Sequence, residues 1–106
     1  MSAAGITVEL LDGLLRLAVV FLQAELLLVV TALLDGTHKV GSLHARGYAA
    51  DLRARHIPTD RLEPLRQKIQ AALGPSWDVL LEFDRNMVPH YHIEFDKGHN
   101  GGKDNP

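Results

Sequence analysis

Residues 77–95 of the chain read WDVLLEFDRNMVPHYHIEF, and this stretch decides the fold. Two runs rich in apolar and aromatic residues, 77–83 and 90–95, are separated by six residues that include asparagine and proline. This pattern predicts two antiparallel strands joined as a hairpin. Polar residues alternate with apolar ones in the second run, which places their side chains on one face of the strand. These polar residues are His90, His92 and Glu94.

The N-terminal third of the chain predicts a helix followed by a strand. Between residues 7 and 25, apolar residues recur at three- and four-residue spacing, as on one face of a helix. Thr7 is the expected N-cap, and the carboxylates of Glu9 and Asp12 lie near the positive end of the helix dipole. Residues 26–33 are apolar and β-branched, which is typical of a central strand buried on both faces.

The middle of the chain predicts a second strand and a second helix. In residues 48–53, alternation places Ala49, Asp51 and Arg53 on one face of a strand. Residues 60–63 have the form of a capping box and therefore predict the start of a helix, which Gly74-Pro75 ends. The apolar stripe expected on this helix consists of Leu62, Leu65, Ile69 and Leu73.

The order helix, strand, strand, helix, strand, strand predicts an α+β fold, with a small, mainly antiparallel sheet and two helices. With 106 residues, the chain is long enough for a single domain. We expect residues 1–97 to form this domain. Residues 98–106 are polar and rich in glycine, so we expect a disordered tail there.

Composition and charge exclude several classes of function. Apolar residues make up 46% of the chain and charged residues 23%, as in ordinary globular proteins. The net charge of −2 gives no basic excess for nucleic-acid binding. The most apolar segment, residues 14–34, is interrupted by Arg16, Gln23 and Glu25, so we expect no stable membrane insertion and no signal peptide. Cysteine is absent, so any metal must be held by nitrogen and oxygen ligands.

A histidine and an aspartate near the second strand add to the polar face of the hairpin. Seven residues separate His44 from Asp51, and a turn at Gly47 can bring the loop histidine over the strand aspartate. A buried carboxylate needs a partner, because an unpaired buried charge is costly. Two histidines and a carboxylate can hold Zn²⁺ and leave one position open for water, as in catalytic zinc sites. Pairing of Asp51 with Arg46 or Arg53 is the alternative.

The chain resembles the D-alanyl-D-alanine carboxypeptidase and L-alanyl-D-glutamate endopeptidase family in two motifs, Ser42-x-His44-x-x-Gly47-x-Ala49-x-Asp51 and His90-x-His92. These zinc enzymes belong to the lysostaphin, D-Ala-D-Ala peptidase and hedgehog superfamily, and many small members are phage endolysins. The resemblance covers roughly residues 29–95. It implies that His44, Asp51 and His92 are the ligands of a Zn²⁺ ion.

The resemblance also implies how hydrolysis would proceed. Zinc lowers the pKa of its water toward roughly 7 and polarises the scissile carbonyl, while a nearby base takes the water proton. Many relatives place a carboxylate base three residues before the third ligand, where this chain has Pro89. His90 is the first candidate for the base, Glu82 the second and Asp84 the third.

Two further residues are expected beside the metal ligands. Ser42 is placed to hydrogen-bond near the site, and Glu94 is placed to orient His92. For Glu94, an exposed strand charge is the alternative.

The expected function is that of a zinc metallopeptidase that hydrolyses an amide bond in peptidoglycan stem peptides, in the manner of an endolysin. Such a protein would be made in the cytoplasm and would reach the cell wall after holin-type release or on a phage particle. The alternative is a non-catalytic metal-binding or wall-binding module of the same fold, carried on a virion. The motifs leave endopeptidase and carboxypeptidase action equally open.

Overall fold

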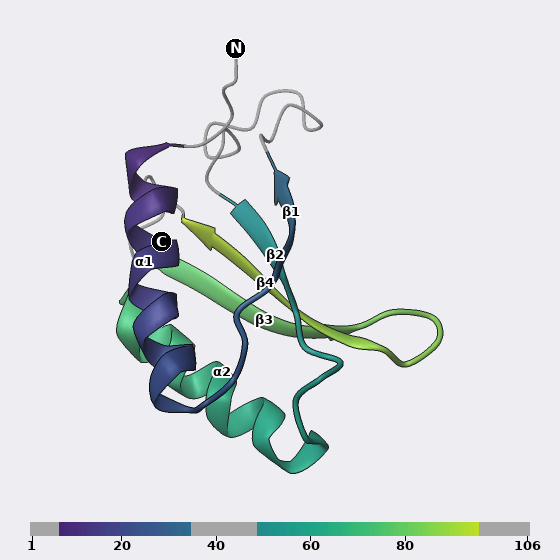
Figure 1. Ribbon diagram of the computed structural model, residues 1–106. Coiled ribbons are helices and arrows are strands. Elements are labelled where there is room, and N and C mark those ends of the chain that lie inside the picture. Colours follow the sequence, from purple (N-terminus) through teal and green to yellow (C-terminus); the bar gives the residue numbers. More distant parts are fainter. Residues whose placement is uncertain (1–6, 35–48, 96–106) are drawn as a thin grey trace.

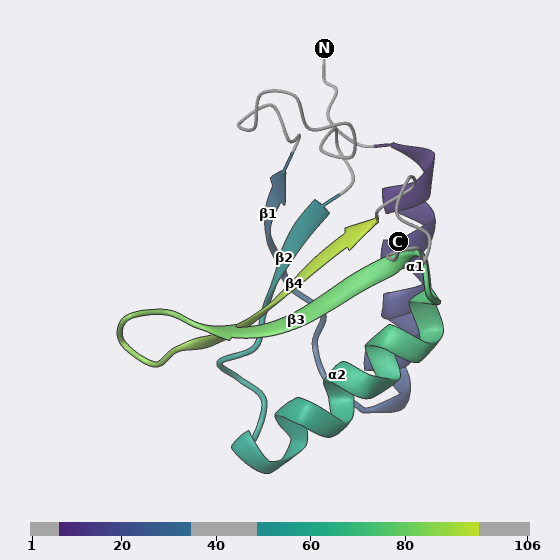
Figure 2. The same cartoon turned by 180° about the vertical axis from the view of Figure 1, so that it is seen from behind.

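Two helices and a four-stranded sheet make up residues 7–34 and 49–95, the part of the chain that the computed structural model describes. The elements are α1 (Val8–Gln23), β1 (Val30–Leu34), β2 (Ala49–Arg53), α2 (Thr59–Leu73), β3 (Trp77–Phe83) and β4 (Pro89–Phe95). The strand order is β1-β2-β4-β3, and all neighbouring strands are antiparallel. Both helices lie on one side of the sheet (Figure 1, Figure 2). The predicted α+β domain is therefore confirmed, while the expected tail at 98–106 lies outside the described residues.

Helix α1 begins as its sequence predicts. The side-chain oxygen of Thr7 accepts a hydrogen bond from the backbone N–H of Leu10 at 3.1 Å, so Thr7 is the N-cap. Glu9 lies in the first turn. The helix ends at Gln23, and the N–H of Ala24 bonds the carbonyl of Val20. Within residues 7–34 and 49–95, neither helix combines the length and the apolar content needed to cross a membrane.

Strand β1 corrects the expectation of a central strand buried on both faces. It starts at Val30 rather than at residue 26 and lies at the edge of the sheet, paired with β2 alone among the described strands. Val30 and Leu33 are 37% and 47% exposed. The apolar residues that precede β1 have another role, because Leu26 and Leu28 pack against the core before the strand begins. The apolar residues before β1 are therefore explained by packing of the segment that connects α1 to β1. They do not indicate a strand buried on both faces.

Helix α2 begins two residues earlier than the predicted capping box implies, and the capping box is not formed. Pro58 occupies the N-cap and makes no side-chain capping bond. The Glu63 carboxylate, which would have reached back to the cap, instead accepts hydrogen bonds from Arg66 Nε and Gln67 Nε2. The predicted end at Gly74 is confirmed, with φ of +95°. The predicted stripe is also confirmed, since Leu62, Leu65, Ile69 and Leu73 are all buried.

The core lies between the helices and one face of the sheet. Tyr91 and Ile93 of β4 are fully buried, as are Ala50 and Leu52 of β2. The Tyr91 hydroxyl donates a hydrogen bond to the carbonyl of Leu62 at 2.6 Å and so joins β4 to α2. Burial raises the pKa of Tyr91 to about 12, so this donor stays protonated over the whole physiological range.

Helix α1 packs closely against Trp77 of β3 at Gly13. A Cβ atom added at Gly13 would lie 2.6 Å from two ring atoms of Trp77, Cζ2 and Cη2, a distance that real contacts do not reach. The Trp77 ring also packs against Phe95, with ring centroids 5.3 Å apart, so it has little room to move. Because Gly13 has no side chain, α1 can pack directly against the indole ring of Trp77.

We expect the substitution Gly13→Ala to destabilise the protein by about 1–3 kcal/mol, because the added methyl group overpacks the contact with Trp77. In an ordinary helix the same change would stabilise by roughly 0.5–1 kcal/mol. Urea unfolding of Gly13→Ala, in the wild-type and in a Trp77→Phe background, measures the coupling. Loss of the penalty in the Phe background is expected, because the clashing ring atoms are then gone. An unchanged or increased stability of Gly13→Ala in the wild-type background would contradict the contact.

Candidate functional site

The site lies on the sheet face that points away from the helices. Asp51 of β2 is directly opposite His92 of β4 in the register of these two strands. Residues paired in this way point to the same face of an antiparallel sheet. Asp51 Oδ1 and His92 Nδ1 lie 2.8 Å apart. The sequence placed both residues in one site, and the strands bring them together.

His92 is held at both of its ring nitrogens. Its Nε2 lies 3.2 Å from Glu94 Oε1, while Nδ1 faces Asp51. Glu94 therefore contacts His92, as expected for a residue that orients it. Hydrogen bonding to Glu94 raises the pKa of His92 to about 9, with a further rise from the hydrogen bond and charge of Asp51, while burial opposes the rise. In the protein without metal, His92 is therefore a cation between two carboxylates at neutral pH.

Asp51 and His92 offer donor atoms of the types that zinc binds. Zinc binds histidine nitrogen and carboxylate oxygen at about 2.0–2.2 Å, so two ligands of one ion lie roughly 3.3 Å apart. The observed separation of 2.8 Å is that of a hydrogen bond, so the two side chains would have to move slightly apart to share an ion. Within residues 7–34 and 49–95, no three histidine, aspartate or glutamate side chains are arranged to hold a metal ion. The predicted third ligand, His44, and the neighbouring Ser42 lie outside the described residues.

A second histidine–carboxylate pair lies beside the first. His90 of β4 is directly opposite Glu82 of β3, and His90 Nε2 lies 3.0 Å from Glu82 Oε1. His90 is two residues from His92 on the same strand, so both rings lie on the open face. The first two candidates for the base are thus in contact with each other. Their side chains are 32% and 46% exposed, within reach of a solute.

Asp84, the third candidate for the base, shapes the turn between β3 and β4. Its Oδ1 atom accepts hydrogen bonds from the backbone N–H groups of Asn86, at 2.7 Å, and Val88, at 3.0 Å. These bonds hold a turn in which Met87 has a φ of +64°. The contacts give Asp84 a structural role at this oxygen. Asp84 also lines the pocket described next.

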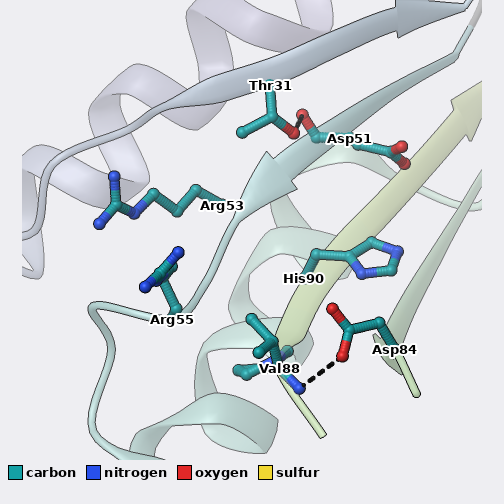
Figure 3. A pocket seen from close by; sticks show the side chains of 8 residues that line it. Thr31, Asp51, Arg53, Arg55, Asp84, Val88 and His90 are labelled. Carbon is teal, nitrogen blue, oxygen red and sulfur yellow. Dashed lines mark hydrogen bonds between the residues drawn. The ribbon is translucent and has the colours of Figure 1, made fainter. Parts of the chain in front are cut away.

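A pocket opens at the end of the site near this turn (Figure 3). Its lining comes from β1, β2, the segment after β2, the β3–β4 turn and the start of β4. Arg53 and Arg55 extend toward one side of the pocket, and the side chains of His90 and Asp84 lie on the other. The lining residues are Thr31, Asp51, Arg53, Arg55, Asp84, Val88, Pro89 and His90.

The two arginines were not predicted as part of a site. Alternation along the strand does place Arg53 on the same face as Asp51, which could have identified it. Arg55 follows the end of β2, where alternation no longer applies, so the sequence held no signal for it. Thr31 lies beside Asp51 and donates a hydrogen bond from Oγ1 to the Asp51 carbonyl at 3.3 Å. Ion pairing of Asp51 with Arg53 is not formed, and Arg46, the other partner considered from sequence, lies outside the described residues.

The chain matches no protein-family model, and searches of curated proteins and of solved structures found no match to it.

We expect His92 of the metal-free protein to titrate with a midpoint near pH 9 when followed by NMR of its ring protons. Its folded-state pKa lies above the unfolded value of about 6.5. The contacts with Glu94 and Asp51 therefore contribute their full stability below pH 6.5, and this contribution is lost as the pH rises through 9. The loss should be about 1–3 kcal/mol in the free energy of unfolding.

The substitution Glu94→Gln should lower the His92 midpoint, because it removes the largest cause of the shift. Glu82→Gln is the matched control, since Glu82 contacts His90 and not His92. A His92 midpoint near 6.5 in the metal-free wild-type protein would contradict the paired arrangement.

Proposed function

We propose that the protein is a zinc metallopeptidase that hydrolyses an amide bond in peptidoglycan stem peptides. The observation that carries the proposal is the approach of Asp51 and His92 on the open face of the sheet, with donor atoms 2.8 Å apart. These two residues come from strands that are adjacent in space and about forty residues apart in the sequence. They are also two of the three ligands that the family resemblance assigns.

The proposed ligands of the zinc ion are His44, Asp51 and His92. Glu94 supports this assignment, because its carboxylate takes the hydrogen on Nε2 and leaves Nδ1 of His92 for a metal. Only seven residues separate His44 from Asp51, so His44 has a short tether to the site. Zinc, when bound, supplies a Lewis acid that activates water and polarises a carbonyl.

His90 is the proposed general base. Its Nε2 faces Glu82, which fixes the ring and stabilises the cation that forms when the ring takes a second proton. Nδ1 is then the atom that accepts the proton of the attacking water. The same N–H can return the proton to the leaving amine, as microscopic reversibility requires. The Glu82–His90 pair thus supplies the base that many relatives place at the position of Pro89, a residue that cannot take a proton.

Arg53 and Arg55 support a substrate with a carboxylate. Neither guanidinium has a hydrogen bond or ion pair with another residue of the described ranges that would neutralise it. Arginine presents a planar fork of donors that matches a carboxylate, and stem peptides carry free carboxylates. The two side chains lie on the side of the pocket opposite His90. A carboxylate bound to them would therefore hold the peptide near the proposed base.

A protein with this activity would act on the cell wall after holin-type release or on a phage particle. The rival is a non-catalytic metal-binding or wall-binding module of the same fold. The rival is favoured by the proline at position 89 and by the turn contacts that engage Oδ1 of Asp84. Both functions would involve binding of a metal and of the cell wall. Only the peptidase would also hydrolyse its substrate.

We expect the purified protein to bind one Zn²⁺ ion per chain, measured by elemental analysis after dialysis and by calorimetric titration. Asp51→Asn, His92→Gln and His44→Ala should each abolish stoichiometric binding, since each removes one ligand. His99→Gln is the matched control and should bind zinc like the wild type. Binding that survives all three ligand substitutions would exclude this site as the metal centre.

We expect digestion of purified cell walls to release new amino termini at a rate that falls by roughly 10²–10⁴ in His90→Gln, with zinc content unchanged. Glu82→Gln should reduce the rate less, because the base remains and only its orientation is lost. The double substitution Arg53→Gln and Arg55→Gln should raise KM more than it lowers kcat. Wall binding without release of amino termini by the zinc-loaded wild-type protein would reject the peptidase and favour the non-catalytic module.

A further inference from the structure

Helix α1 carries a second apolar stripe, on the side that the core does not use. Five large apolar residues of this helix are at least half exposed: Val8 (80%), Leu11 (50%), Leu15 (61%), Val19 (53%) and Leu22 (75%). On a helix that turns 100° per residue, these five fall within an arc of about 80°. The buried residues Leu10, Gly13, Leu17 and Phe21 form the roughly opposite arc. The exposed stripe is as narrow as the seam of a coiled coil.

The spacing of the stripe is symmetric about Leu15. Val8 and Leu22 lie seven residues before and after Leu15, and Leu11 and Val19 lie four residues before and after it. An identical helix running in the opposite direction, crossing at Leu15, would therefore place an apolar side chain opposite each of the five. This is the self-complementarity that a two-fold, isologous interface requires.

One ion pair lies beside the stripe, and its arginine also donates a hydrogen bond to the carbonyl of Ala72 in α2. Asp12 and Arg16 lie along one edge of the stripe and form an ion pair at 3.0 Å. In an antiparallel pair about a two-fold axis, this edge meets the same edge of the other copy. Asp12 and Arg16 then each lie about 3 Å along the helix axis from Arg16 of the second copy, so each arginine has one carboxylate and one like charge of the other copy at that axial distance. A parallel pair would instead set this edge against the opposite edge, which carries the small Ala18.

We propose that α1 pairs with α1 of a second copy of this chain, antiparallel, about a two-fold axis at Leu15. The seam from Val8 to Leu22 is about 21 Å long, which gives an interface well below the standard size of about 800 Å² per partner. The dimer is therefore weak, with a Kd in the micromolar range. Helix α1 and the Asp51–His92 pair lie on opposite faces of the sheet, so the dimer leaves both copies of the site open.

The first test is sedimentation equilibrium between 5 and 500 µM. We expect a concentration-dependent monomer–dimer equilibrium for the wild-type protein. Leu15→Glu should be monomeric throughout, because it places two carboxylates against each other at the axis. Met87→Glu is the matched control, at an apolar residue that is 71% exposed and lies in the β3–β4 turn. Circular dichroism checks that both variants fold.

The second test uses the absence of cysteine from the chain to report the direction of the two helices. Val8→Cys and Leu22→Cys, mixed under mild oxidation, should form a disulfide between the two variants, while each alone should cross-link poorly. Cross-linking of Val8→Cys with itself would show a parallel pair and overturn the proposal. A wild-type protein that stays monomeric at 500 µM would also overturn it. Sedimentation of that monomer with phosphatidylglycerol vesicles would assign the stripe to a lipid surface.

Discussion

The position of β4 between β2 and β3 is the constraint on which the rest of the structure depends. Side chains alternate along β4, so burial of Tyr91 and Ile93 forces His90, His92 and Glu94 onto the other face. A shift of one residue would move every apolar side chain of the strand into solvent. Each fully buried side chain of this size contributes roughly 1.5–3 kcal/mol. Packing on one face of β4 therefore fixes the polar geometry on the other.

The parts of the fold that depend on periodicity could be predicted from the sequence. The hairpin, the polar face of β4 and the stripe of α2 follow from spacings of two or of three and four residues, which burial enforces directly. The edge position of β1 could not be predicted, because an apolar run does not reveal which strands lie beside it. The prediction of a capping box was wrong, because the Glu63 carboxylate accepts hydrogen bonds from Arg66 and Gln67 instead.

The residues of the site also divide into those that the sequence could predict and those that it could not. Asp51, His92 and Glu94 lie together as expected, since two strands of known alternation carry them. The partnership of His90 with Glu82 depends on the register of the hairpin, which its turn sets and which composition does not encode. Arg55 comes to the pocket from beyond the end of β2, a position that only the path of the chain determines. For Ser42 and His44 the motif remains a prediction, because they lie outside the described residues.

The paired geometry of Asp51 and His92 suits a bound proton and is also compatible with the proposed metal site. With its pKa raised to about 9, His92 is protonated at neutral pH, so a cation that binds there must displace a proton. Metal affinity at such a site rises with pH until the histidine is deprotonated. An ion pair in the apoprotein is thus compatible with a metal site, since the pair keeps both donors together before the metal arrives.

The contact of Gly13 with Trp77 gives the protein its own optical reporter. Trp77 is the only tryptophan of the chain, and its ring lies where α1 meets the sheet. Its fluorescence therefore follows the seating of α1 with no signal from other indoles. Detachment of this helix would expose the ring to water and shift its emission to longer wavelength, while the polar face of β4 could keep its structure. Undocking of the helix and loss of the site can thus be followed as separate events in one sample.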